Sequence, residues 1–107
     1  MNIDIREIKF LAERDKIAFK NHAIMRMNER KIFADDVKDA LLNGEIIEIY
    51  EKDRPLPSCL IFGKTFKGKA LHIVIAIDSK SSMLWVITVY EPNLELWEEG
   101  FKKRRAK

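Results

Sequence analysis

The run from Ala70 to Glu91 constrains the fold most, because it holds two β-rich segments joined by a short polar connector. The segments are residues 70–78 and 84–91, and this composition predicts a β-hairpin with residues 79–83 as its loop. Side chains alternate between the two faces of a strand. We expect one face of the hairpin to look into a hydrophobic core. Strict alternation assigns seven side chains to that face: Leu71, Ile73, Ile75, Ile77, Trp85, Ile87 and Val89.

The opposite face of the hairpin is mixed and carries the first candidate for chemistry. If residues 79–83 form the loop, Asp78 lies opposite Leu84, and His72 then lies opposite Tyr90. An imidazole beside a phenol can transfer protons. The same pair can also be two boundary residues whose polar ends are hydrogen-bonded. Both interpretations remain open at this stage.

The length and composition predict one globular domain over residues 1–107. With 47% hydrophobic and 35% charged residues, the chain has the composition of a globular protein rather than a disordered one. The single Cys59 cannot form an internal disulfide, and its apolar surroundings favour a small buried hydrophobe. No apolar run approaches bilayer length, and charges interrupt the first residues. We therefore expect a cytoplasmic protein without a membrane contact.

The positive charge is concentrated at the C-terminus. The net charge is +3, but five basic residues lie within residues 102–107, and the remainder carries 15 basic and 17 acidic side chains, a net charge of −2. A basic tail on a balanced body suits phosphate backbones. The candidate nucleic-acid ligands are Lys102, Lys103, Arg104 and Arg105. The alternative is a solubilising, solvated end.

Three helices are expected in the N-terminal part, over residues 3–15, 22–30 and 35–43, from their apolar spacing. In the second of these helices His22, Arg26 and Arg30 are four residues apart, so they share one stripe. Such a stripe can hold a phosphate, because the guanidinium group matches phosphate oxygens. The alternative is a solvated face on which Glu29 neutralises one arginine.

The remaining pattern completes an α+β fold class. Residues 45–51 and 59–64 are expected strands, and residues 53–58 form a loop stiffened by two prolines. With the hairpin they predict a four-stranded antiparallel sheet, with the N-terminal helices packed on one face. Residues 16–20 are expected to be a link. After Pro92, residues 93–105 are expected to form a short C-terminal helix or tail, anchored by Leu96, Trp97 and Phe101.

Several kinds of chemistry lack their motifs. The chain has no Gly-rich phosphate loop, no cysteine pair with zinc spacing and no nucleophile elbow. With two histidines and one cysteine, neither a metal site nor another cofactor is expected. The remaining His, Tyr and Arg side chains suffice for metal-independent RNA cleavage. That reaction needs a base, an acid and a cation that stabilises the charged phosphorane.

Several short motifs occur in the same order as in one known family. The strings are His22-Ala-x-x-Arg26-Met-x-x-Arg30-x-Ile32, Asp36-Val37, Gly44-Glu45-Ile-Ile-Glu-x-Tyr50, Asp53-x-Pro55-x-Pro57-Ser58, Leu71-His72-x-Val74, Ile87-Thr88-x-Tyr90-x-Pro92 and Trp97. Over roughly residues 20–105 this pattern resembles the bacterial domain-of-unknown-function family DUF4258, which looks related to the BrnT and RelE-like toxins of toxin–antitoxin pairs.

That resemblance implies a RelE-like fold and a cytoplasmic toxin. The toxin would act as an endoribonuclease on RNA, including ribosome-bound RNA, and would have a cognate antitoxin protein as its partner. His72 or His22 would be the general base or acid, and Tyr90 would donate a proton or position the 2′-hydroxyl. Arg26 and Arg30 would neutralise the scissile phosphate, and residues 102–105 would grip the flanking backbone. The alternatives are a non-catalytic nucleic-acid-binding module and a protein-interaction module of the same fold.

Overall fold

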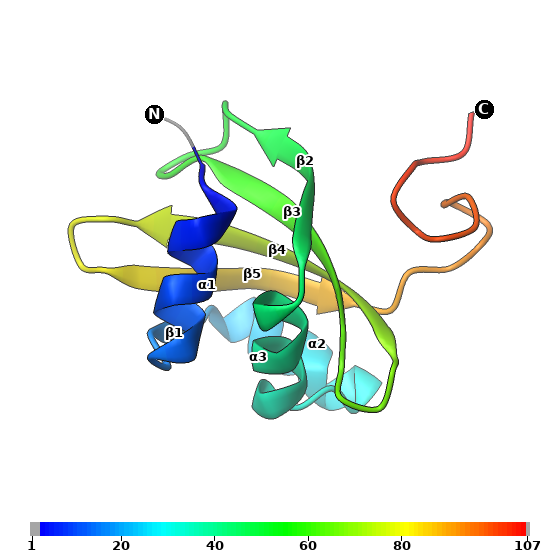
Figure 1. The fold of residues 1–107 in the computed structure, drawn as a ribbon, viewed down its shortest axis with the longest axis horizontal. Coiled ribbons are helices and arrows are strands. Elements are labelled where there is room, and N and C mark those ends of the chain that lie inside the picture. The colour runs from blue at the N-terminus through cyan, green and yellow to red at the C-terminus, as the bar shows by residue number, and fades with distance from the viewer. Residues whose placement is uncertain (1–2, 107) are drawn as a thin grey trace.

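The computed structural model describes residues 3–106, which form three helices and five strands (Figure 1). One strand lies between the first and second helices, and the other four follow the third helix. The helices are α1 (Ile5–Glu13), α2 (Asn21–Arg30) and α3 (Ala34–Leu42). The strands are β1 (Ile17–Phe19), β2 (Glu45–Tyr50), β3 (Ser58–Lys64), β4 (Ala70–Asp78) and β5 (Met83–Tyr90).

The five strands form one mixed sheet in the order β1-β5-β4-β3-β2. β1 runs parallel to β5, and the other neighbours are antiparallel. The expected RelE-like, four-stranded antiparallel sheet is therefore wrong. The missed strand, Ile17–Phe19, has three residues, which is too few to show an alternating pattern. Its partners are residues 84–86, so nothing local in the sequence marks it as a strand.

The β4–β5 hairpin has a tighter turn than predicted and compensates with a bulge. Asp78 pairs with Met83 rather than with Leu84, and a register shift then adds one residue to β5. Beyond the bulge His72 lies opposite Tyr90, so that predicted pairing is confirmed. The bulge also changes which β5 side chains enter the core. Leu84, Val86 and Val89 are the buried ones, and the assignment of Trp85 and Ile87 to the core face is wrong.

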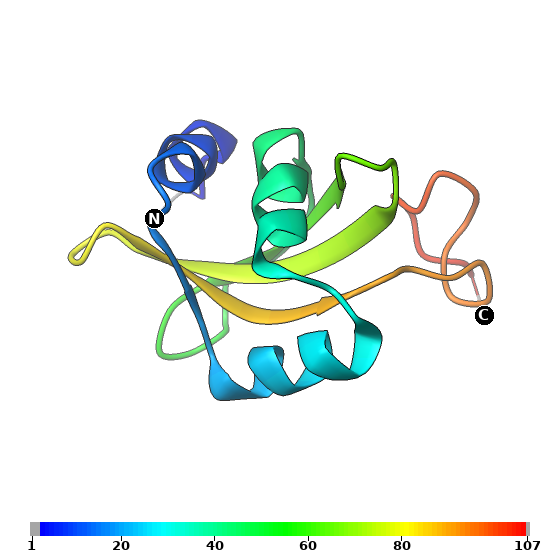
Figure 2. The ribbon, with the colours of Figure 1, turned by 90° about the horizontal axis from the view of Figure 1, so that it is seen from below.

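The sheet lies between two unequal helical layers. Figure 2 shows α1 and α3 on one side of the sheet and α2 on the other, beside β5. The backbone of Lys20, just before α2, donates to the Val86 carbonyl, so α2 starts at the β5 edge. All three helices contribute to one buried apolar cluster, whose members include Ile8, Leu11, Ala23, Val37, Leu41, Ile61, Ile73, Ile75, Leu84 and Val86. Each large side chain buried there stabilises the fold by about 1.5–3 kcal/mol.

The approach of α3 to β3 depends on Gly63. A β-carbon at this position would lie 1.9 Å from the carbonyl oxygen of Ala40. Only glycine therefore allows the backbone of β3 to pass this close to α3, and this contact fixes the helix against the core face of the sheet.

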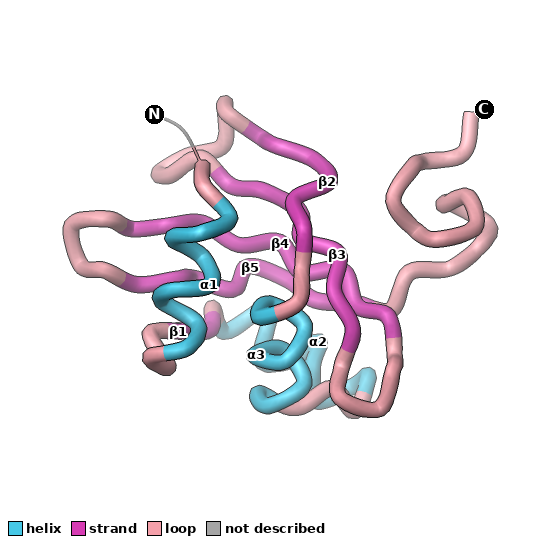
Figure 3. Tube along the Cα trace, in the orientation of Figure 1, coloured by secondary structure: helices cyan, strands magenta, loops and turns pink. Residues whose placement is uncertain are grey.

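The residues after β5 form no helix within the described chain, as the loop colouring of Figure 3 shows. Residues 93–106, here called the C-terminal clasp, fold back on themselves through a bridge between Trp97 and Arg104. Gly100 and Phe101 have φ of +88° and +60°. Two consecutive left-handed residues reverse the chain and prevent a right-handed helix. Of the two forms expected for this segment, a short helix or a tail, the structure shows an irregular tail.

No helix among residues 3–106 has both the length and the apolar character needed to cross a membrane.

Candidate functional site

The centre of the candidate site is the hydrogen-bonded pair of His72 on β4 and Tyr90 on β5. The Nε2 atom of His72 lies 2.7 Å from the carbonyl oxygen of Phe101, and Nδ1 lies 3.1 Å from the Tyr90 hydroxyl. A carbonyl can only accept, so Nε2 carries the proton and donates it to Phe101. In the neutral ring Nδ1 is then the acceptor, and the Tyr90 hydroxyl donates to it. The clasp thus selects the tautomer of His72.

The clasp buries the His72 member of this pair. His72 is 0% exposed and Trp97 is 1% exposed, and their rings meet edge to face with centroids 4.4 Å apart. Burial lowers the pKa of His72 below its ordinary value of 6.5, although the Phe101 carbonyl and Glu48 act in the opposite direction. His72 is therefore neutral at pH 7, with its basic nitrogen directed at a phenol.

Tyr90 is more exposed than its partner His72. Its side chain is half-buried, and burial raises its pKa, while the nearby charges of Arg104 and Arg30 lower it. The guanidinium of Arg30 donates to the Val89 carbonyl at 2.8 Å. The structure therefore brings together three of the predicted site residues: His72, Tyr90 and Arg30.

An ion pair between β2 and the clasp closes the other side of the site. Arg104 binds Glu48 through two hydrogen bonds of 2.7 and 3.1 Å, and its guanidinium lies 4.6 Å from the centre of the Trp97 ring. The Tyr50 hydroxyl donates to the same carboxylate at 2.5 Å. The bond from Arg104 is the main reason that the pKa of Glu48 is below its usual value. Burial, followed by the bond to Glu48, raises the pKa of Tyr50 to about 12.

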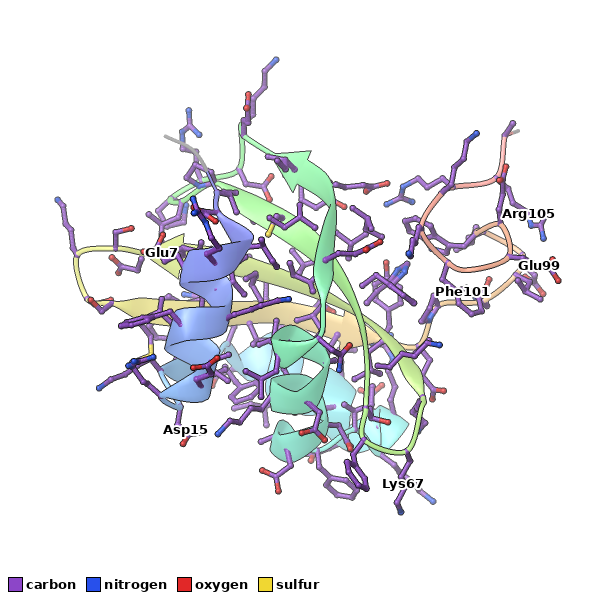
Figure 4. The ribbon with its side chains drawn as sticks, in the orientation of Figure 1. Glu7, Asp15, Lys67, Glu99, Phe101 and Arg105 are labelled. Carbon is purple, nitrogen blue, oxygen red and sulfur yellow. The ribbon has the colours of Figure 1, made fainter. Side chains whose placement is uncertain are left out.

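The basic tail is largely engaged with the protein itself. Lys102 pairs with Glu45 at 3.0 Å, and Arg104 pairs with Glu48. The Arg105 side chain donates to the Leu94 carbonyl, at the outer part of the clasp where Figure 4 labels it. The Lys103 side chain is exposed. Two of the four predicted nucleic-acid ligands therefore already contact carboxylates of β2.

The predicted helix stripe is divided between two environments. His22 is exposed and Arg26 is half-buried. Arg26 Nε lies 3.4 Å from His22 Nε2, and Arg26 also pairs with Glu29 at 3.4 Å. This pairing is the neutralisation that the alternative interpretation of the stripe expected. Arg30 turns to the β5 edge instead. His22 and Arg26 therefore lie apart from the contacts that surround His72.

Sequence reasoning missed two contributors to the site, Glu48 and the Phe101 carbonyl. The role of Glu48 depends on a register shift in β2 that aligns Glu45 and Glu48 with alternate positions of β3. No sequence pattern signals that shift. For Phe101 the signal was indirect, because it was expected only as an apolar anchor.

Cys59 is buried, as predicted, and burial raises its pKa to about 12. A thiol with that pKa remains protonated at neutral pH, so it does not act as a nucleophile. Within residues 3–106 no group of three or more His, Cys, Asp or Glu side chains is arranged to hold a metal ion.

The fold and the site define a small α+β protein whose mixed sheet carries an imidazole–phenol pair under a C-terminal cover. The chain belongs to the family described as a domain of unknown function (DUF4258), whose profile matches residues 19–91. No curated protein and no solved structure matches the chain. The matched range contains His72 and Tyr90 but ends before the clasp. It is therefore shorter than the resemblance noted from the motifs, which covered roughly residues 20–105.

Proposed function

We propose that this protein is the toxin component of a bacterial toxin–antitoxin pair and cleaves RNA without a metal ion. The observation that carries the proposal is the bond between His72 Nδ1 and the Tyr90 hydroxyl, 3.1 Å, beside the cationic Arg30. A neutral imidazole with its acceptor nitrogen on a phenol is a relay that can take a proton and later return it.

The proposed reaction uses Tyr90 as the group that touches RNA and His72 as the base behind it. The 2′-oxygen attacks the adjacent phosphorus as its proton passes to Tyr90, while the phenol proton passes to His72. The bond to the 5′-oxygen breaks, and the relay returns the proton to that oxygen. Arg30 stabilises the charge that develops on the phosphorane. The products are a 2′,3′-cyclic phosphate and a 5′-hydroxyl.

This division of roles follows from burial. His72 is fully covered by Trp97 and cannot meet a substrate directly while the clasp is closed, whereas Tyr90 is half-buried. We therefore assign the phenol of Tyr90, and not His72, as the group that contacts the RNA. His22 is exposed and is the second candidate for the base, with Arg26 as its cation.

The experiment combines growth on induced expression with cleavage of an end-labelled RNA in the presence of EDTA. Tyr90→Phe and His72→Gln should each slow cleavage by about 10²–10⁴-fold, the usual loss when a positioned acid or base is removed. Tyr50→Phe is the matched control. It also removes the hydroxyl of a half-buried tyrosine, but that hydroxyl is bonded to Glu48 and not to His72. The proposal fails if Tyr90→Phe and His72→Gln cut RNA as fast as Tyr50→Phe. If only His22→Ala loses activity, the general base is His22 on α2 instead of His72.

A second candidate is a non-catalytic RNA-binding or protein-interaction module. The observation that favours it is that both ring nitrogens of His72 are already bonded inside the protein. In that case His72→Gln would lower thermal stability and leave RNA or partner binding unchanged. Co-expression with the product of the adjacent reading frame tests the antitoxin part of the proposal, because a cognate antitoxin should co-purify and relieve growth arrest.

A further inference from the structure

A hollow next to His72 is formed jointly by the sheet and the clasp. It is an open hollow with a volume of about 510 Å³ between the β3–β4 turn and the clasp. Phe62, Lys64 and Ala70 line it from the sheet, and Phe101 and Lys102 line it from the clasp. We call it the sheet–clasp pocket. Its size falls within the range of ordinary ligand sites.

The charge of the sheet–clasp pocket has one sign. Its lining holds two lysines and no carboxylate. Lys102 pairs with Glu45, which lies outside the lining, and no carboxylate pairs with Lys64 among residues 3–106. Another hollow of the same volume lies near Trp85, but Lys20 and Arg54 are balanced there by Asp53 and Asp78. The sheet–clasp pocket is therefore the one of these two that selects an anion.

Its walls also offer aromatic surface and space. Phe62 and Phe101 are half-buried, and the Lys102 ammonium lies 5.8 Å from the centre of the Phe62 ring. Gly68 and Gly100 complete the lining, and a β-carbon built on either would meet no atom within 4 Å. Aromatic rings beside lysines are the combination with which proteins hold single-stranded nucleic acids, through base stacking and phosphate contacts.

We propose that the sheet–clasp pocket binds one nucleotide of a single-stranded RNA, with its phosphate on Lys64 and Lys102 and its base against Phe62 or Phe101. This inference rests on the proposed function for the choice of RNA as ligand. Ala70 precedes His72 by two residues on the same face of β4, which is about 7 Å along the strand. A nucleotide in the pocket therefore places its neighbour beside the His72–Tyr90 pair. In this arrangement the clasp is a wall of the binding site as well as a cover.

The test measures binding separately from cleavage. The probe is a short, fluorescein-labelled, single-stranded 2′-O-methyl RNA, which lacks the attacking hydroxyl and stays intact, and the readout is fluorescence anisotropy with the full chain. Lys64→Glu and Phe101→Leu are the pocket variants. Lys80→Glu is the matched control, because it makes the same charge change in the exposed β4–β5 turn, at the opposite end of the sheet from the clasp (Figure 1). Thermal melting checks that every variant is folded.

Both pocket variants should bind the probe about tenfold more weakly than wild type, and Lys64→Glu should also lower the salt dependence of binding. Lys80→Glu should bind within about twofold of wild type. Equal affinities of Lys64→Glu and Lys80→Glu would overturn the inference. So would tight binding of adenosine or uridine 5′-monophosphate by a chain that does not bind the RNA probe, because the pocket would then be a free-nucleotide site.

The two proposals can fail separately. If pocket variants lose affinity for the probe while wild type never cuts ordinary RNA, the pocket inference stands and the ribonuclease proposal falls. If wild type cuts RNA and the pocket variants bind the probe as wild type does, cleavage stands and the sheet–clasp pocket is not its nucleotide site.

Discussion

Replacing Trp97 by alanine should release the C-terminal clasp while the sheet stays folded. Trp97 is 1% exposed, and removing a large aromatic side chain from such a position costs about 3–5 kcal/mol. The other side-chain links between clasp and sheet include the Lys102–Glu45 and Arg104–Glu48 pairs, which are more than half exposed on the basic side. Exposed ion pairs contribute about 0–1 kcal/mol each. The bond from His72 to the Phe101 carbonyl adds about 0.5–1.5 kcal/mol. Trp97 therefore supplies the largest single contribution that holds the clasp closed.

Amide hydrogen exchange measures this opening residue by residue. The backbone N–H groups of Glu98, Phe101 and Arg105 are bonded within the clasp, to the carbonyls of Lys103, Glu98 and Leu96. In Trp97→Ala their exchange should approach that of an unstructured chain, while amides of β3 and β4 keep their protection. The pKa of His72 should rise toward 6.5 in the same variant, because its burial is the main cause of the lowered value.

Leu96→Ala is the control, because this neighbour of Trp97 is 61% exposed and should change neither quantity. Unchanged protection of the clasp amides in Trp97→Ala would show that other contacts hold the clasp. A uniform loss of protection through β3 and β4 would show that the clasp and the sheet unfold together. Either result would refute the reasoning.

Three further predictions concern pH, charge and packing. The free energy of unfolding should decrease as the pH falls below 6.5, because the unfolded chain then protonates His72 while the buried ring, whose pKa is lowered, resists protonation. Urea titrations should show a smaller decrease for His72→Gln. Arg104→Ala should raise the pKa of Glu48 toward its ordinary value of 4.5, and a carboxyl NMR titration that finds no rise would contradict the assignment of Arg104 as the main cause. Gly63→Ala should destabilise the protein by about 1–3 kcal/mol or more, since its β-carbon would overlap the Ala40 carbonyl, and thermal melting close to wild type would show that α3 can move away at little cost.

The sequence predicted the elements whose patterns are long. Three amphipathic helices and four strands lie within two residues of their expected bounds. The pairing of His72 with Tyr90 was also predicted, although the turn before it is one residue shorter than assumed. The pairing is kept because the shorter turn shifts the register by one residue, and the bulge in β5 shifts it back by one. That compensation depends on packing against the core, which alternation alone does not describe.

Contacts between distant segments were not predictable in the same way. β1 is three residues long, and its pairing with residues 84–86 leaves no local periodicity. In the clasp, Phe101 adopts a positive φ that nothing in its side chain favours. The charge count of the tail could not reveal that Glu45 and Glu48 are partners of Lys102 and Arg104. Burial of Trp97, which was expected to anchor the tail, is the part of this region that the sequence did indicate.

The parallel pairing of β1 with β5 also sets the order in which the chain can fold during synthesis. Ile17–Phe19 are synthesised well before their partners at residues 84–86, so β1 must wait for β5. Until then the apolar side chains of α1 and the N-terminal half of α2 lack part of the surface that they cover in the finished protein. A chain that stops before Met83 would therefore leave β1 without the strand on which it docks, whereas a chain that stops after Tyr90 would keep all five strands and lack the clasp.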